Sequence, residues 1–148
     1  MTDPSEPAIE RVRASFAKQG LMHTLGASLG RIAPGEVEIA LVPSAAVGQQ
    51  HGFVHAGAVA AIADSAAGYA ALSLMRPGAG VLTTEFKINL LAPATGDRIV
   101  ARGRVVKAGR TLTLAQSEVH AETDRGTKLV ALLTATLMTV EGRDGVGD

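Results

Sequence analysis

The sequence has no cysteine, few aromatic side chains and no excess of charge of either sign. The absence of cysteine excludes disulfide bonds, a thiol nucleophile and cysteine-ligated metals. Aromatic residues make up 3% of the 148 residues, which argues against a surface that stacks nucleic-acid bases. Fourteen basic and fourteen acidic residues cancel, so no overall field favours nucleic acid or an anionic membrane. We therefore expect an ordinary globular protein that has no nucleic-acid partner.

Neither a signal peptide nor a membrane span is expected. The first seven residues hold two acidic side chains and two prolines, and they lack the basic start and apolar core of a signal peptide. One long apolar stretch, Gly52–Met75, is rich in alanine and glycine and carries Asp64 near its centre. That aspartate would cost at least ~2.5–3.5 kcal/mol in a bilayer, so we interpret the stretch as a buried helix. We expect a cytoplasmic protein that makes no membrane contact.

The spacing of apolar residues predicts a single α+β domain. Helical spacing predicts two helices, Ser5–Gln19 stopped by Gly20 and His55–Met75 ended by a Pro-Gly pair. Residues 43–54 are expected to form a loop. Residues 1–20 would be an N-terminal helix and tail, 21–140 the domain, and 141–148 a flexible C-terminal tail. Alternating apolar residues predict six strands: Leu21–Ala33, Glu36–Val42, Val81–Leu91, Arg98–Lys107, Thr111–Thr123 and Lys128–Val140.

The helix predicted over His55–Met75 is apolar on every face, and such a helix must be surrounded. Long antiparallel strands can wrap around one side of it. Its many alanines and glycines permit a close approach on the other side, which we expect to be made by a second copy of the chain. The sequence thus predicts a homo-oligomer.

Asp64 is the one formally charged residue between Gly52 and Met75. Aspartate is almost never fully buried without a partner or a chemical task. One interpretation is therefore a catalytic carboxylate, and the alternative is a solvated helix residue at the edge of a subunit. The apolar residues on both sides favour the catalytic interpretation.

Two histidines, His51 and His55, precede the long helix at a spacing of four. They straddle the predicted junction between loop and helix, and no third ligand follows at a matching spacing, so we expect no metal site. His55 opens the helix, where it either caps the first turn or takes part directly in catalysis.

The start of this helix and Asp64 are too far apart to act together within one chain. Nine helical residues separate His55 from Asp64, a distance of about 13 Å along the axis. The backbone N–H groups of Ala56 and Gly57 could polarise a carbonyl at the helix start, beyond the reach of Asp64 in the same chain. Two such helices packed antiparallel would bring Asp64 of one chain beside Ala56 of the other. We therefore expect a site shared by two chains.

The pattern Gln49-x-x-Gly52-x-x-His55-Ala56-Gly57 followed by Asp64 resembles the PaaI-like acyl-CoA thioesterases of hotdog fold. Three further segments of the chain resemble the same family, and together the resemblance covers roughly residues 20–140. It implies the hotdog fold, a long antiparallel sheet wrapped around one central helix. The segments are a strand ending at a proline corner, a glycine-arginine turn and the last strand: Phe86–Ala94, Val105–Thr111 and Gly126–Val140.

The resemblance implies roles for six residues at the site. Asp64 matches the catalytic carboxylate, which acts as general base or as nucleophile. Ala56 stands where the family usually has glycine, at the position whose backbone N–H binds the thioester oxygen. Gly57 follows in the same helix start. Gln49 matches a residue that orients the thioester or the water, and His55 matches the helix-opening histidine. Thr83 matches a hydroxyl that places the water, with Thr84 as a rival for that role.

The implied activity is hydrolysis of an aryl- or medium-chain acyl-CoA, with coenzyme A as part of the substrate and no separate cofactor. Three basic residues either meet the phosphates of coenzyme A or form a solvated strand face: Arg104, Lys107 and Arg110. The expected assembly is a homodimer with shared active sites, itself paired into a tetramer. Two alternatives stay open, a hotdog-fold hydratase or dehydratase of acyl thioesters and a non-enzymatic acyl-CoA-binding module.

Overall fold

The computed structural model describes residues 5–148, and the first four residues of the predicted N-terminal tail lie outside them. Two short helices come first, α1 (Glu6–Ala17) and α2 (Gly20–Leu25). The strands β1 (Ser28–Ala33) and β2 (Glu36–Leu41) and a 3₁₀ turn (Ala45–Val47) precede the long helix α3 (Ala56–Leu72). Four strands complete the chain: β3 (Gly80–Leu90), β4 (Arg98–Ala108), β5 (Leu112–Thr123) and β6 (Gly126–Val140).

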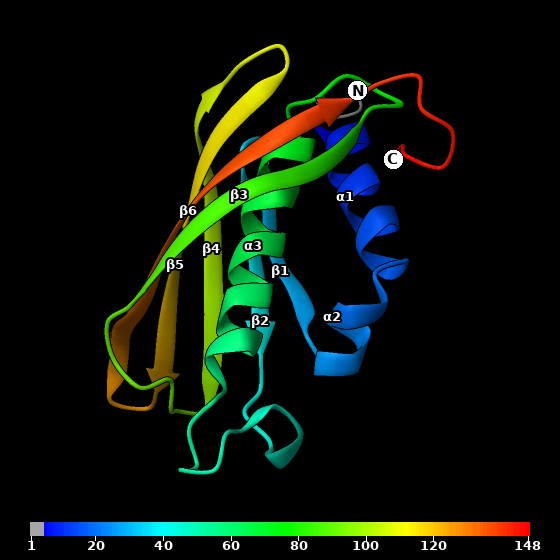
Figure 1. Ribbon diagram of the computed structural model, residues 1–148. Helices are drawn as coiled ribbons and strands as arrows, with labels where there is room; N and C mark the ends of the chain where they lie inside the picture. Colours follow the sequence, from blue (N-terminus) through cyan, green and yellow to red (C-terminus); the bar gives the residue numbers. More distant parts are fainter. Residues whose placement is uncertain (1–4) are drawn as a thin grey trace.

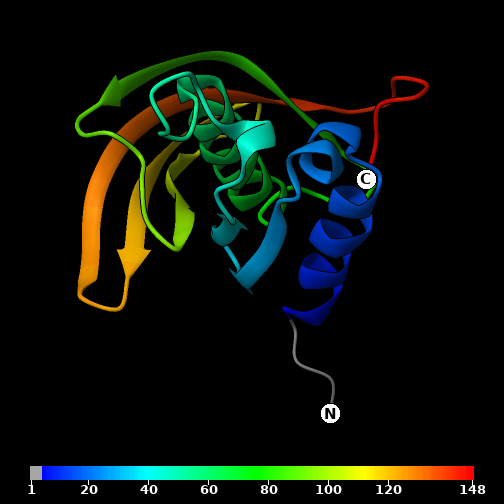
Figure 2. The same ribbon diagram turned by 90° about the horizontal axis from the view of Figure 1, so that it is seen from below.

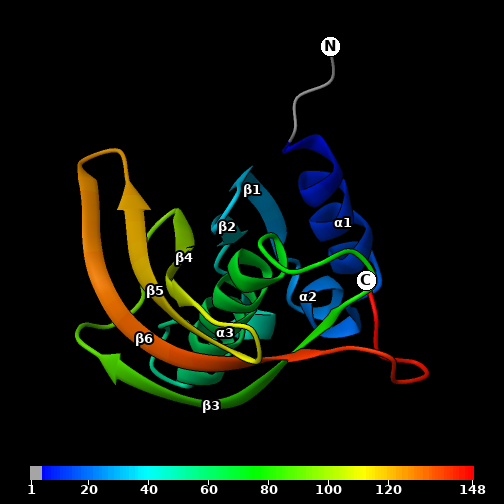
Figure 3. The same cartoon turned by 90° about the horizontal axis from the view of Figure 1, so that it is seen from above.

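All six strands of residues 5–148 form one antiparallel sheet in the order β1-β2-β4-β5-β6-β3. The sheet curves around α3, which lies inside the bend (Figure 1, Figure 3). β3 pairs with β6 on one side, and its other side is a free edge of the sheet. The predicted arrangement of long antiparallel strands around one central helix is confirmed.

Close packing against the sheet sets the rotation of α3 about its axis. Gly103 on β4 has no room for a side chain, because a Cβ atom there would lie 2.3 Å from the backbone of Ala66. Ser117 on β5 donates its Oγ hydrogen to the carbonyl of Ala63 at 2.6 Å. Alanines with little or no exposed surface form the sheet-facing side of the helix. Asp64 and Ser65 are consequently turned away from β4.

The predictions for residues 19–27 are wrong in two respects. Gly20 does not stop the first helix but begins α2, and the strand predicted from Leu21 starts only at Ser28. Leu21 and Leu25 are four residues apart, so α2 can place both on one side while Met22 is fully buried. Gly26 ends α2 with a left-handed φ of 69°, a conformation that favours glycine.

The side of α3 that faces away from the sheet is covered in part by the chain's own N-terminal helices, rather than by a second copy alone. The rings of Phe16 and Tyr69 lie 6.0 Å apart, between α1 and α3. α3 therefore lies between β3 on one side and α1 and α2 on the other (Figure 1, Figure 3). Between them, one stripe of small or polar residues stays wholly or partly exposed: Ala56, Gly57, Ala60, Ala61, Asp64 and Ser65.

Arg11 of α1 links the C-terminal end of α3 to the end of the chain. Its guanidinium donates to the carbonyls of Leu72 and Met75 at 2.9 and 3.0 Å, and it pairs with the Asp148 carboxylate at 2.8 Å. These contacts satisfy carbonyls that a helix end leaves without partners.

The flexibility predicted for residues 141–148 stays a prediction. Within residues 5–148, no helix is long and apolar enough to cross a membrane.

Candidate active site

The N-terminus of α3 is capped by the side chain of His55. The Gly57 N–H donates to His55 Nδ1 at 2.7 Å, so the proton of the neutral ring lies on Nε2. This bond corrects the expectation for Gly57, because its N–H is engaged by the cap and is not free to bind a substrate oxygen. The Ala56 N–H finds no acceptor within residues 5–148. The helix start thus offers two donors, the Ala56 N–H and the His55 Nε2–H.

The loop before α3 places Gln49 next to this helix start. The Gln49 N–H donates to the Phe53 carbonyl at 2.8 Å, and the His55 N–H donates to the Val47 carbonyl at 2.8 Å. The Gln49 side-chain oxygen accepts from the His51 N–H, which leaves the carboxamide NH₂ group to donate elsewhere. The loop, drawn in teal in Figure 2, lies across the N-terminal end of α3.

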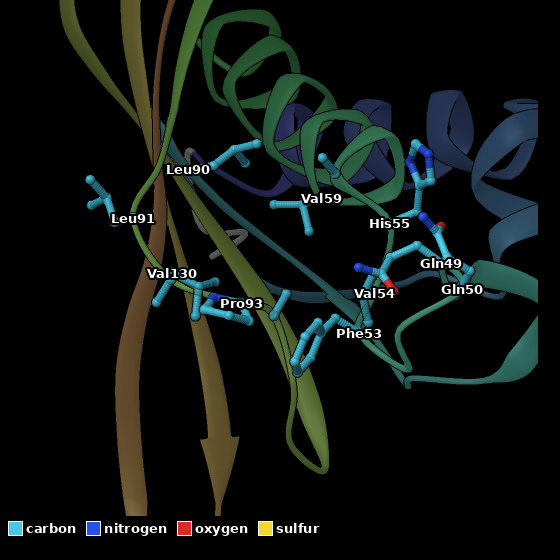
Figure 4. A pocket seen from close by; sticks show the side chains of 13 residues that line it. Gln49, Gln50, Phe53, Val54, His55, Val59, Leu90, Leu91, Pro93 and Val130 are labelled. Atoms are coloured by element: carbon cyan, nitrogen blue, oxygen red, sulfur yellow. The ribbon is translucent and has the colours of Figure 1, made fainter.

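A hollow of about 510 Å³ lies at this end of α3. In Figure 4 the side chains of Leu90, Leu91 and Pro93 line one side of it, and those of Gln49 and His55 line the other. Its volume falls within the range of small-molecule pockets, about 300–1,000 Å³. The complete lining comes from the loop, the first turns of α3, the end of β3 with the segment after it, and one residue of β6: Gln49, Gln50, Phe53, Val54, His55, Ala56, Val59, Leu90, Leu91, Ala92, Pro93, Ala94 and Val130.

Asp64 lies in the middle of α3 and is bound by Thr83 of β3. The Thr83 hydroxyl donates to Asp64 Oδ1 at 2.8 Å, whereas Thr84 donates to the Thr136 carbonyl of β6 at 3.1 Å. Of the two threonines left open by the sequence, Thr83 is therefore the one beside the carboxylate. Burial raises the pKa of the Asp64 carboxyl above its usual range, and the hydrogen bond from Thr83 offsets part of that rise.

A group of polar side chains beside Asp64 was missed from the sequence. Ser65 donates to Gln19 Oε1 at 2.9 Å, and Gln19 Nε2 donates to the Tyr69 hydroxyl at 3.0 Å. These residues and Ser15 share a hollow of about 160 Å³ with Asp64 and Thr83. The spacing of four between Ser65 and Tyr69 could have indicated this group, since it places both side chains on one side of a helix. Gln19 gave no such signal, because it was assigned to a helix end.

One chain does not bring the carboxylate and the helix-start donors together. Ala56 and Asp64 belong to one uninterrupted helix, and eight residues separate them by about 12 Å along the axis. They also line different hollows, Ala56 the larger one and Asp64 the smaller one. Within one chain the carboxylate and the helix start are therefore two separate places.

Two of the three basic residues proposed for coenzyme A, Lys107 and Arg110, lie far from the larger hollow in the same chain. Arg104 donates to Gln116 Oε1 at 2.9 Å. Lys107 and Arg110 flank the turn between β4 and β5, at the top of Figure 1, while α3 begins at the bottom. In that turn the Thr111 carbonyl accepts a hydrogen bond from the Thr139 N–H of β6 at 2.8 Å. Thr139 is nine residues, or about 30 Å along the strand, from Val130 in the hollow.

Comparison with known proteins places the chain in a family. The model of the family described as Thioesterase superfamily matches residues 51–128, which include the end of the loop, α3 and the strands β3, β4 and β5. A thioesterase family protein from Silicibacter pomeroyi is 50% identical, with a TM-score of 0.89 over 91% of this chain and 99% of that one. It has the same hotdog fold of a sheet wrapped around one helix.

Two PaaI proteins also match in structure. A mutant of the phenylacetic acid degradation protein PaaI from Thermus thermophilus is 30% identical over 81% of this chain and 98% of that one, with a TM-score of 0.71. The PaaI protein of the E. coli phenylacetic acid degradation operon is 22% identical over 95% and 98% of the two chains, with a TM-score of 0.84, and shows the fold alone. The chain therefore belongs to the thioesterase superfamily, as a PaaI-like thioester hydrolase of hotdog fold.

Proposed function

We propose that the protein hydrolyses acyl-CoA thioesters at sites shared by two chains of a homodimer. The observation that carries this proposal is the separation of the half-sites: Asp64 with Thr83 lies about 12 Å along α3 from the Ala56 N–H. An antiparallel second copy would bring the Asp64 half-site of one chain to the helix start of the other. In a monomer the carboxylate and the helix-start donors would lie too far apart to act on one thioester.

The free edge of β3 supports this homodimer. Phe86 and Leu90 point to the same side of the sheet as the buried Ala135 and Ala131, their partners on β6, yet they are 46% and 55% exposed. The edge of β3 also offers unpaired backbone groups that a second β3 strand would satisfy. Pairing two such edges antiparallel would cover these apolar side chains and bring Asp64 of each α3 helix toward the start of the other.

A tetramer, as a dimer of such dimers, is also part of the proposal. On the outward side of the sheet, Leu82, Met138 and Leu112 form a row across β3, β6 and β5, because Met138 pairs with both leucines. Leu82 and Leu112 are 44% and 51% exposed. A second dimer packed on this apolar row would remove it from water.

In the proposed reaction the thioester oxygen binds at the Ala56 N–H and the His55 Nε2–H, at the positive end of the α3 dipole. The Gln49 NH₂ group orients the substrate. Asp64 of the other chain takes a proton from water while the water oxygen attacks the carbonyl carbon, and the C–S bond then breaks to release the thiolate of coenzyme A, which is protonated. In the alternative route Asp64 attacks the carbonyl itself and water hydrolyses the resulting anhydride. Neither route uses a cofactor.

Hydrolysis of a panel of acyl-CoA thioesters tests the proposed function. The panel should include phenylacetyl-, benzoyl-, acetyl-, octanoyl- and crotonyl-CoA, with free thiol release and hydration of the crotonyl double bond measured side by side. We expect thiol release from at least one substrate and no hydration. Tight binding without turnover would instead identify an acyl-CoA-binding module, and hydration without thiol release would identify a hydratase.

We place the reaction in the cytoplasm, since a chain without cysteine suits a reducing compartment.

Replacing Thr83 by valine should shift the pH dependence of the reaction. The base acts only when ionised, so kcat/KM falls as the pH drops through the pKa of Asp64, which burial raises. The Thr83 hydrogen bond lowers this pKa, so its loss should raise the pKa further. The acidic limb of the profile should then move to higher pH, and kcat/KM should fall roughly tenfold near the limb. Thr84→Val is the matched control, because Thr84 bonds to Thr136 instead. An unmoved limb in Thr83→Val would contradict the role of Asp64 as base.

We also propose that Arg104, Lys107 and Arg110 of one chain bind the coenzyme A phosphates of a substrate held at the helix start of the other. The antiparallel dimer supports this, because it places the β4–β5 turn of one chain near the Leu90 end of its partner. Arg110→Ala should raise KM for acyl-CoA about fivefold and change KM for the matching acyl-pantetheine, which lacks those phosphates, less than twofold. Arg13→Ala, at an exposed side chain of α1, is the control. Equal effects on both substrates would assign Arg110 to a solvated surface.

A further inference from the structure

Another hollow, of about 310 Å³, meets the larger hollow of the candidate site at His55. It lies between α2 and the first turns of α3, and His55 is the residue that it shares with the hollow of Figure 4. The α2 helix that forms one wall is the element that was absent from the sequence prediction. The hollow is lined by Leu21, Leu25, Ala46, Val47, Gly48, His55, Gly57, Ala58 and Ala61.

Both hollows are lined mainly by apolar residues, and they differ in the polar groups that reach them. Gln49 and Gln50 bring two carboxamides to the larger one, whereas His55 is the only polar side chain that lines the one between α2 and α3. The two parts of an acyl-CoA thioester on either side of its carbonyl, the pantetheine arm and the acyl arm, differ in polarity in the same way. The pantetheine arm carries amide groups that need hydrogen-bond partners, and the acyl arm of an unsubstituted chain carries none.

We propose that the groove between α2 and α3 binds the acyl group of the substrate, and that this group is an unbranched aliphatic chain of medium length. The inference rests on the proposed function and goes beyond it by choosing between aryl and aliphatic substrates. The carbonyl bound at the Ala56 N–H and His55 lies where the two hollows meet, so the acyl arm continues into the apolar groove while the pantetheine arm lies along the Gln49 side.

The walls of the groove fit a flexible chain better than a ring. Leu21 and Leu25 stand about 6 Å apart along α2, and both can lean over the floor made by Ala58 and Ala61. No phenylalanine, tyrosine or tryptophan lines the groove to stack on an aryl group. Leu21 is 54% exposed in spite of its apolar character, which is explained if a bound chain covers it.

Changing Leu21 should alter the dependence of kcat/KM on chain length. In the unmodified protein we expect kcat/KM to rise about fourfold for each methylene group from acetyl- to octanoyl-CoA. Leu21→Trp, which fills the groove, should abolish most of this rise while acetyl-CoA hydrolysis changes less than threefold. Leu21→Ala should weaken octanoyl-CoA hydrolysis about tenfold and acetyl-CoA hydrolysis little. Leu74→Ala, at a 47% exposed leucine just beyond the C-terminal end of α3, should leave the profile unchanged.

A binding measurement separates failure of this inference from failure of the proposed function. The probes are S-octyl- and S-methyl-coenzyme A, thioethers that cannot be hydrolysed. A preference for the octyl compound that Leu21→Trp removes supports the groove even if no thioester is turned over, which would overturn only the proposed function. Equal affinity for both compounds overturns the inference, as does a chain-length profile that neither Leu21 variant changes. A Leu21→Trp variant whose only effect is on oligomeric state would show that a second copy covers the groove, and would overturn it too.

Discussion

Asp64→Asn should lower kcat for the best thioester substrate at least ~100-fold without loss of the fold. Asparagine has the shape of aspartate, and its carbonyl oxygen can still accept the hydrogen bond that Thr83 donates to Asp64 Oδ1 at 2.8 Å. What the substitution removes is the ability to take a proton from water or to attack a carbonyl. Because a partly buried negative charge is removed as well, the variant should unfold at a temperature no lower than that of the unmodified protein.

The neighbouring Ser65→Ala is the matched control for this variant. Ser65 follows Asp64 on α3 and donates to Gln19 at 2.9 Å, so its loss perturbs the same small hollow without touching the carboxylate. We expect its kcat to fall less than about fivefold. Turnover by Asp64→Asn within fivefold of the unmodified protein would exclude Asp64 as base and as nucleophile, provided that binding of S-octyl-coenzyme A is unchanged.

The sequence predicted the central helix and its carboxylate because both leave strong local signals. An apolar run without β-branched clusters, closed by Pro77 and Gly78, is typical of a buried helix, and α3 was observed over Ala56–Leu72 within it. A single aspartate in such a run has few explanations other than function. The strands from Val81 onward were also correct, because long alternating segments specify which face is buried.

The helix α2 could not be read from the sequence, because six residues carry too little periodicity to distinguish a helix from a strand. Leu21 and Leu25 fit a helix, but Leu21, His23 and Leu25 also fit alternation. Burial of Met22 by the rest of the fold decided the outcome. The groove that underlies the inferred acyl preference was invisible for the same reason.

The engagement of the Gly57 N–H was likewise beyond the sequence. His55 was expected either to cap the helix or to act in catalysis, and the structure shows the cap, with Nδ1 accepting at 2.7 Å. That bond follows from a side-chain rotamer, which no residue pattern encodes. It leaves the His55 Nε2–H as a donor toward the site, so the cap also supplies a group to the proposed chemistry.

Mixed dimers of two inactive variants should recover activity if each site draws on two chains. Asp64→Asn removes the carboxylate, and Ala56→Pro removes the backbone N–H that lacks an acceptor within residues 5–148. Proline suits this place, because Ala56 is the first residue of α3 and His55 has the extended backbone, φ −61° and ψ 138°, that precedes proline. Each variant alone should retain less than about a hundredth of the unmodified activity.

In a mixed dimer one shared site collects both lesions and the other collects neither. Refolding equal amounts of the two variants together makes half of the dimers mixed, and each mixed dimer has one intact site of two, so up to about a quarter of the unmodified activity should return. Mixing the two folded proteins without refolding is the control and should restore nothing until subunits exchange. If differently tagged chains are shown to associate and no activity returns, the carboxylate and the donor belong to the same chain, and α3 must bend or the substrate must span about 12 Å between them.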